Sequence, residues 1–284
     1  MDFFYHIIST MGFTLPLCMG YTVLFGRGKI LHFGPIGVAL ASAYGTFLTF
    51  GATNSFALAL CGGILVSLSL SVVFAWLSFR LDPDCLGILS IAGHLILLAV
   101  VLNWQSVTNG ALGITNIPRI WFMQSQGAFA FWISVVCIGW IVFFLWLERT
   151  SFMRQLSALS EQEWYGKALG INRIRVHLIT FLIVGLCIGT DNFFYPQYLH
   201  LLYPTDYMYP VFISLMMMVV AGKPGSIWGA IIASVLLILL KEMIPFLPLP
   251  ISVIGPIRLL LFGVILLAAV WYRRDNMFPK KRTI

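Results

Sequence analysis

Charged side chains are scarce in this chain of 284 residues. Only 10% of the residues are Asp, Glu, Lys or Arg, and 60% are Ala, Val, Ile, Leu, Met, Phe, Trp, Tyr or Cys. A water-soluble domain carries about 25% charged residues, so this chain cannot cover its surface in water. The scarcity excludes a soluble protein and predicts an all-α, polytopic transmembrane bundle that occupies residues 1–284 as a single domain.

Several chemical signatures are lacking as well. The five cysteines are widely spaced in apolar stretches and form neither a disulfide framework nor a zinc pattern, and the five histidines have no metal spacing. The segments 26–29 and 222–223 each resemble part of a phosphate loop, but both fail its spacing. We therefore expect no metal, no cofactor and no ATP bound by the chain itself. Without HExxH or GxSxG, an enzyme is disfavoured.

Long charge-free runs predict the membrane crossings, because an unpaired charge near the bilayer centre costs at least ~2.5 kcal/mol. The run 30–79 would extend about 75 Å as one helix, so it must break, and the turn-like segment 51–55 is the natural place. We expect about nine crossings, within a range of eight to ten. The expected helices cover 4–25, 34–50, 56–79, 86–102, 128–147, 176–195, 208–221, 227–243 and 256–272.

The positions of the positive residues predict the orientation. With nine crossings and the N-terminus outside, fourteen of the 17 Lys and Arg residues fall in cytoplasmic segments, including the basic tail 273–284. This asymmetry follows the positive-inside rule and places the C-terminus in the cytoplasm. Positive residues that flank membrane helices give no reason to expect a nucleic-acid partner, so the lipid bilayer accounts for the net charge of +7.

Three segments differ from plain spans. Residues 103–127 are rich in small and polar residues and predict a long outer loop, whereas 148–175 form a polar cytoplasmic segment long enough for a helix outside the membrane. The stretch 185–204 mixes apolar residues with Gly, Thr, Asp, Asn and Pro, which favours a broken helix that lines a cavity.

The polar segment 148–175 contains an acidic patch followed by a short helical pattern that stops at a glycine. This segment resembles the coupling loop of ABC importer permeases of the branched-chain amino acid family, the LivM and LivH type. The residues that carry the resemblance are Glu163, Ala168, Leu169, Gly170, Ile171 and Asn172. The resemblance implies contact with an ATPase by Glu161, Glu163, Tyr165, Gly166, Ala168, Leu169 and Gly170. Tyr165 and Gly166 stand where that family usually has two alanines, which predicts an altered fit in the ATPase groove.

Other segments resemble the same family in the same order, from about residue 20 to residue 265. They include 108–110 in the outer loop, the pair 217–222 and 225–229, and 258–263 in the last helix. The resemblance implies a permease subunit in the inner membrane, with no enzymatic activity of its own, that moves branched-chain or related amino acids by alternating access. It also implies separate ATPase subunits that use ATP, a second homologous permease that forms a hetero- or homodimer, and an extracytoplasmic solute-binding protein.

The residues themselves suggest a substrate pathway. Asp191 lies in an apolar segment and needs a partner, water or a polar ligand such as a substrate ammonium group. The candidate pathway residues are Ser90, His94, Thr108, Asn109, Gly110, Asp191 and Asn192. The pairs Gly185 with Gly189 and Gly225 with Gly229 have GxxxG spacing, which predicts close helix packing.

Three alternatives remain open at this point. The chain can be a permease for urea, short amides or simple sugars, or an ion-coupled secondary transporter in which Asp191 carries the coupling. The third alternative is a multi-pass membrane enzyme.

Overall fold

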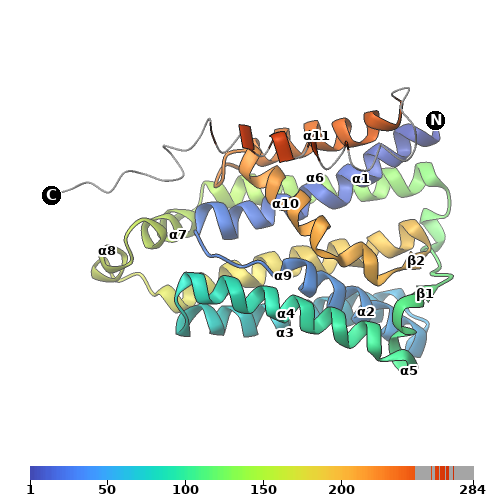
Figure 1. The fold of residues 1–284 in the computed structure, drawn as a ribbon, viewed down its shortest axis with the longest axis horizontal. Helices are drawn as coiled ribbons and strands as arrows, with labels where there is room; N and C mark the ends of the chain where they lie inside the picture. Colours follow the sequence, from blue (N-terminus) through green and yellow to red (C-terminus); the bar gives the residue numbers. More distant parts are fainter. Residues whose placement is uncertain (247–256, 258–259, 262, 266, 269–270, 272–284) are drawn as a thin grey trace.

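The protein is a bundle of long antiparallel helices in the computed structural model (Figure 1). The structure describes residues 1–246 together with 257, 260, 261, 263–265, 267, 268 and 271, and the side chain of Tyr165 is not described. The expected helix 256–272 and the tail 273–284 lie wholly or largely outside these residues.

Seven helical stretches of the described chain are long and apolar enough to cross a membrane. They are α1 with the π-helical turn η1 (Asp2–Arg27), α2 (Pro35–Thr53), α3 (Phe56–Arg80), α4 (Pro83–Asn103), α6 (Gln126–Glu148), α9 (Arg173–Leu199) and α11 with η5 (Ile227–Phe246). An eighth apolar helix, α10 (Tyr209–Ala221), is shorter. Each coincides with an expected helix to within a few residues, which confirms the all-α class.

The long apolar run breaks where the sequence predicts. Helix α2 ends at Thr53, and Asn54 takes a left-handed conformation with φ of 51°, which suits Asn better than most residues. Ser55 then caps α3 by accepting a hydrogen bond from the backbone N–H of Leu58 at 3.5 Å. The two helices return antiparallel and pack along their length.

Helix α9 packs closely on α3 through small residues. A Cβ atom on Gly185 would lie 2.9 Å from Cβ of Ser71, and one on Gly189 would lie 3.1 Å from Cα of Ile64. The hydroxyl of Ser67 donates to the carbonyl of Gly185 at 2.6 Å across this contact. Small residues let two helix backbones approach this closely, and the hydroxyl adds an interhelical hydrogen bond.

The prediction of a broken helix between residues 185 and 204 is wrong as far as Leu199, because α9 is continuous up to that residue. Helix α9 continues to Leu199, and several of its polar side chains bond to carbonyls of the preceding turn: Asn192 donates to the carbonyl of Ile188 at 2.9 Å. Pro196 also lies inside α9. The helix ends only at His200, which has a φ of 58°.

Gly225 and Gly229 make their close contacts from different elements. Gly225 precedes α11, has a φ of 86° and lies in the turn after α10, whereas Gly229 is helical and lies against the backbone of Gly222. Gly26, in the π-helical turn η1 (Thr22–Arg27), contacts the backbone of Pro224 and Gly225 so closely that a Cβ atom has no room. Gly26 and Gly225 thus allow the end of η1 and the turn after α10 to lie in direct contact.

The segment 103–127 folds as short elements at one end of the bundle. It contains α5 (Gln105–Thr108), η2 (Gly110–Leu112), β1 (Ile114–Thr115) and η3 (Trp121–Met123). Strand β1 pairs antiparallel with β2 (Leu201–Leu202), directly after α9. Arg119 holds the segment to the end of α9 by donating to the carbonyls of Gln197 at 3.1 Å and Tyr198 at 2.9 Å. The positive charge of Arg119 near the C-terminus of α9 also interacts favourably with the negative end of the helix dipole.

The opposite end of the bundle carries two short helices, α7 (Ser151–Glu161) and α8 (Glu163–Ala168). Figure 1 shows them projecting beyond the long helices, at the end away from the N-terminus and from β1 and β2. The expectation of a helix within 148–175 is confirmed. We refer to residues 151–170 as the hairpin.

The contact between α3 and α9 gives a test of the packing. Replacing Gly185 by Val places a side chain against Ser71, so we expect destabilisation of about 1–3 kcal/mol, the usual cost of overpacking. The control is Gly139→Val in α6, because a Cβ atom there meets nothing within 4 Å. Thermal loss of monodisperse protein in detergent measures both, and equal losses would contradict the packing argument.

Candidate functional site

The hairpin is held by an apolar stripe on α7. Met153, Leu156 and Leu159 recur every three residues and are buried. They pack in a cluster with Phe144 at the end of α6 and Val176 near the start of α9. Polar residues cover the other side of α7, as in an amphipathic surface helix.

The second helix of the hairpin folds back on α7 and stops at a glycine. Gly166 lies against Leu159, where a Cβ atom would be 2.7 Å from the Leu159 Cδ2 atom. Gly170 has a φ of 76° and open space around it, and its N–H donates to the carbonyl of Lys167 at 3.0 Å. A left-handed glycine is a usual helix terminator, so the stop expected from the sequence is confirmed. Leu169, beside it, is 75% exposed.

The other residues of the hairpin that the sequence singles out lie as follows. Glu161 and Ala168 are exposed, Gly166 is buried, and Tyr165 belongs to α8.

A network of charges ties α8 to the bundle. The Glu163 carboxylate accepts from Lys167 at 2.7 Å and from Arg173 at 2.9 Å, and Arg173 also donates to the carbonyl of Ser78 at 3.0 Å. Ser78 lies near the end of α3, so this one guanidinium joins α8, α9 and α3. The hydrogen bond from Lys167 and then the charge of Arg173 lower the pKa of the Glu163 carboxyl.

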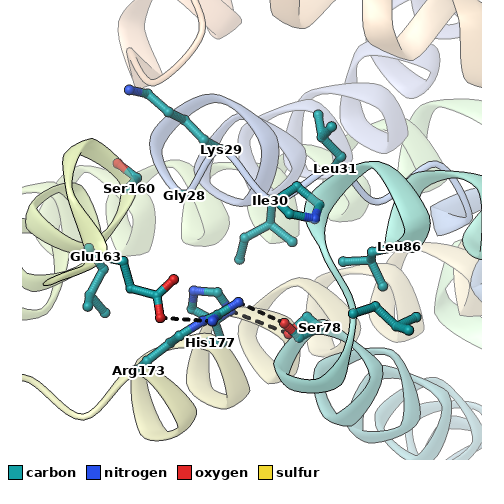
Figure 2. A pocket seen from close by; sticks show the side chains of 13 residues that line it. Gly28, Lys29, Ile30, Leu31, Ser78, Leu86, Ser160, Glu163, Arg173 and His177 are labelled. Atoms are coloured by element: carbon teal, nitrogen blue, oxygen red, sulfur yellow. Dashed lines mark hydrogen bonds and ion pairs between the residues drawn. The ribbon is translucent and has the colours of Figure 1, made fainter. Parts of the chain in front are cut away.

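A cavity of about 230 Å³ lies beside this network (Figure 2). Its polar lining includes Glu163, Arg173, His177 and Ser160. The rest of the wall is mostly apolar and comes from the loop after η1, the end of α3, the start of α4 and α7: Gly28, Lys29, Ile30, Leu31, Ser78, Leu81, Pro83, Leu86 and Leu159. Sequence reasoning missed Arg173, His177 and Ser78, since only the folded chain brings α3, α8 and α9 together.

The expected pathway residues of α4 are buried in the bundle. The Ser90 hydroxyl donates to the carbonyl of Gly87 and accepts from the N–H of Phe33, both at 2.8 Å, so its hydrogen bonds are satisfied. His94 lies one turn further along, packed against Gly37 of α2. Neither ring nitrogen of His94 has a hydrogen-bond partner among the described residues.

The loop residues Thr108, Asn109 and Gly110 lie near the β1–β2 end. The Thr108 hydroxyl donates to the carbonyls of Val101 and Trp104, and Asn109 and Gly110 both have positive φ. These contacts hold the backbone of the loop. The loop adjoins η4 (Pro204–Tyr207), the turn that follows β2.

Asp191, like His94, is a pathway candidate with a buried polar atom that has no hydrogen-bond partner among the described residues. Its side chain is 4% exposed, and its Oδ1 atom has no hydrogen-bond partner among the described residues. The hydroxyls of Tyr44 in α2 and Tyr207 in η4 are buried and unpartnered in the same way. Burial, and then the charges of Tyr195 and Asp206, raise the pKa of Tyr207, and Tyr44 and Asp191 contribute less. Asn192, by contrast, is satisfied within α9.

Tyr44 and Tyr207 were not among the pathway residues expected from the sequence. Tyr207 follows the outer loop in a segment without periodic pattern, so only the fold brings it near α9. A buried unpaired polar group is costly in a protein interior, and three of them from different elements mark a candidate ligand-contact region. In the described part of the chain, no group of three His, Cys, Asp or Glu residues is arranged to hold a metal.

Long apolar helices with a projecting polar hairpin define a multi-pass membrane protein. Residues 4–270 match the family described as "Branched-chain amino acid transport system / permease component". The chain therefore belongs to this permease family of ABC transporters, and the resemblance drawn from the sequence is confirmed.

Two curated relatives carry related names. The probable branched-chain amino acid transport permease protein LivM of Methanocaldococcus jannaschii is 25% identical over 322 aligned residues, which cover 100% of this chain and 89% of the relative. The high-affinity branched-chain amino acid transport system permease protein LivM of Salmonella typhimurium is 24% identical over 304 residues, which cover 98% of this chain and 68% of the relative. No solved structure gives a significant match.

The charge network at α8 predicts a pH dependence. Because the pKa of Glu163 lies below its ordinary value of 4.5, the ion pairs stabilise the folded state above pH 4.5 and are lost only as the pH falls through the lowered pKa. We expect amide hydrogen exchange in 163–168, corrected for intrinsic rates, to stay slow down to pH 4.5 and to rise below it. Protection that falls well above pH 4.5 would contradict this assignment.

The matched variant is Glu163→Gln, which removes the charge and keeps the shape. An exposed ion pair contributes ~0.2–1 kcal/mol, so exchange in α8 should be up to about fivefold faster at neutral pH. The same variant should lack the acid transition.

Proposed function

We propose that this chain is the membrane-spanning permease subunit of an ABC importer for branched-chain or related amino acids. An extracytoplasmic solute-binding protein delivers the substrate, and ATPase subunits drive alternating access. A second permease, either another copy or a homologue, completes the pathway. The single observation that carries the proposal is the hairpin at one end of a bundle that belongs to this permease family.

The surface of the hairpin suits a docking role. Leu169 is 75% exposed and Trp164 is 64% exposed, and both lie on or beside α8 at the tip that projects from the bundle. An apolar tip on a short helix, next to a glycine stop, offers an anchor for a groove on a partner. Arg173 also links the hairpin to the bundle, because it bonds to both Glu163 and the carbonyl of Ser78. A displacement of α8 would therefore be transmitted to α9 and α3.

The charge distribution supports the orientation. The hairpin segment 148–175 holds five of the 17 positive residues, and Arg27, Lys29, Arg80 and Lys223 lie in the other turns assigned to the same side. By the positive-inside rule this side faces the cytoplasm, where the ATPase subunits are. The loop at 103–127 then faces outward, toward the solute-binding protein.

The buried carboxyl supports an amine-bearing substrate. Asp191 provides an acceptor without a partner at Oδ1, and the buried hydroxyls of Tyr44 and Tyr207 also lack a partner among the described residues. The ammonium group of an amino acid would supply the missing donors. The same carboxyl also favours a second candidate, an ion-coupled transporter, and uptake experiments separate the two.

Docking at the hairpin gives the first test. We expect Leu169→Asp to reduce copurification of the ATPase subunits by about tenfold, since a buried apolar anchor contributes about 2 kcal/mol at an interface. The control is Leu112→Asp in η2, because Leu112 is 79% exposed but lies at the other end of the bundle. Equal copurification of both variants would count against the docking role.

Uptake in reconstituted vesicles gives the second test. With the ATPase partners, the binding protein and ATP, we expect leucine uptake, and we expect none from an ion gradient alone. Asp191→Asn should slow uptake by about tenfold or more, because an ion–ammonium contact becomes a neutral hydrogen bond. Uptake driven by an ion gradient without ATPase would overturn the ABC assignment. Normal uptake by the Asn variant would remove Asp191 from the pathway.

A further inference from the structure

The contact between η1 and the turn after α10 gathers positive charge. Arg27 ends η1, Lys29 follows two residues later, and Lys223 lies in the turn. The Arg27 guanidinium donates to the carbonyl of Gly225 at 3.4 Å, so the two segments adjoin. Helix α7 of the hairpin also contacts η1. Three cations therefore lie on two adjoining turns at the hairpin end of the bundle. We refer to Arg27, Lys29 and Lys223 as the basic junction.

The basic junction has no anionic partner within the described chain. No Asp or Glu among the described residues forms an ion pair with any of its three cations. The Nε atom of Arg27 is buried and has no hydrogen-bond partner there, although a guanidinium offers five N–H donors. Lys29 and Lys223 are exposed, and Figure 2 shows the Lys29 ammonium pointing away from Glu163. The positive charge of the junction is thus available to an anion from outside.

Other cations at the same end are already engaged. Arg173 and Lys167 pair with Glu163. Arg80 lies over the ring of Trp76, with 5.6 Å between its Cζ atom and the ring centroid. The basic junction differs from them because its three charges adjoin one another and repel without a counter-ion.

The backbone fixes where the two lysines begin. Lys29 and Lys223 have φ angles of 51° and 72°, in the left-handed region that residues with a side chain rarely adopt. Both lie within a few residues of the contact between Gly26 and Gly225, where the two backbones touch. The close contact of the turns therefore keeps the lysines at the same place on the surface.

Exposed tryptophans mark this end of the bundle as a membrane–water interface. Trp228, in the first turn of α11, is 59% exposed, and it follows Lys223 closely in the chain. Trp146 near the end of α6 and Trp76 near the end of α3 are exposed as well. Tryptophan is enriched at the level of lipid headgroups. The basic junction thus lies where a headgroup can reach it.

The charges select an anionic headgroup. Arginine and lysine bind phosphate through charge-assisted hydrogen bonds, and basic clusters at a membrane surface attract anionic lipids. A zwitterionic headgroup such as phosphatidylcholine brings its own cation into a cluster that has no carboxylate to receive it. A headgroup with a phosphate and no ammonium, such as phosphatidylglycerol, neutralises the cluster instead.

We propose that the basic junction is a binding site for the phosphate of an anionic lipid. The phosphate accepts from Arg27 and pairs with the ammoniums of Lys29 and Lys223, and the acyl chains lie along α11 beside Trp228. The bound lipid bridges η1 and the turn after α10, so it ties the end of α1 to α10 and α11. This site does not depend on which substrate the chain transports.

Lipid binding to the purified chain tests the site without any partner. We would titrate the full chain in detergent with phosphatidylglycerol or phosphatidylcholine of the same acyl chains and count bound lipids by native mass spectrometry. The first phosphatidylglycerol should bind at least about tenfold more tightly than the first phosphatidylcholine. Equal affinities for the two lipids would overturn the proposal.

Single substitutions locate the binding. Lys29→Gln and Lys223→Gln should each weaken phosphatidylglycerol binding by about fivefold, the usual contribution of one basic residue at an anionic surface, whereas Lys223→Arg should keep it. Both lysines are exposed, so neither change disturbs the core. The matched control is Arg175→Gln, because Arg175 is also exposed at the hairpin end, without an ion pair among the described residues, but lies outside the junction. An equal loss in Arg175→Gln would indicate diffuse attraction and overturn the site.

A soluble phosphate ester separates a lipid site from a site for a free metabolite. sn-Glycerol 3-phosphate carries the phosphate without acyl chains, so it should displace phosphatidylglycerol only at about hundredfold or higher concentration than a short-chain phosphatidylglycerol does. Displacement at similar concentrations would assign the junction to a soluble phosphate ester and overturn the lipid site. Loss of the lipid site would leave the importer assignment unchanged, because neither measurement involves transport.

Discussion

The close contact between α9 and α3 is the constraint on which the other features depend. Gly185 and Gly189 let the two backbones approach, and the Ser67 hydroxyl bonds across the contact. In lipid, helices gain little from the hydrophobic effect between them, so van der Waals packing and interhelical hydrogen bonds decide association. With α9 held in this way, its first turn is fixed beside the end of α3, and its buried middle is fixed beside α2.

Helix α9 therefore connects two regions of different chemistry. At one end Arg173 joins the hairpin to Ser78 in α3, and about five turns further along Asp191 is buried without a partner at Oδ1. A rigid helix carries a displacement from one region to the other without any change in its own hydrogen bonds. This arrangement suits transporters whose parts move as rigid bodies around a binding region.

Much of the fold could be predicted from the sequence, because charge-free runs and a few turn residues decide where apolar helices begin and end. The break at Asn54 and the stop at Gly170 follow from local chemistry alone. The continuity of α9 could not be predicted, since it depends on Asn192 bonding back to Ile188. The polar lining of the cavity could not be predicted either, because Ser78, Glu163 and Arg173 meet only when three separate helices are in place.

The two helices of the hairpin differ in mechanical stiffness. Helix α7 is fixed by buried apolar side chains such as Leu156, whereas α8 is held largely by ion pairs whose side chains are partly exposed. Exposed ion pairs are weak and are screened by salt. Helix α8 can therefore adjust to the surface that contacts it, while the packing of α7 and the bonds of Arg173 transmit a displacement of the hairpin to α9.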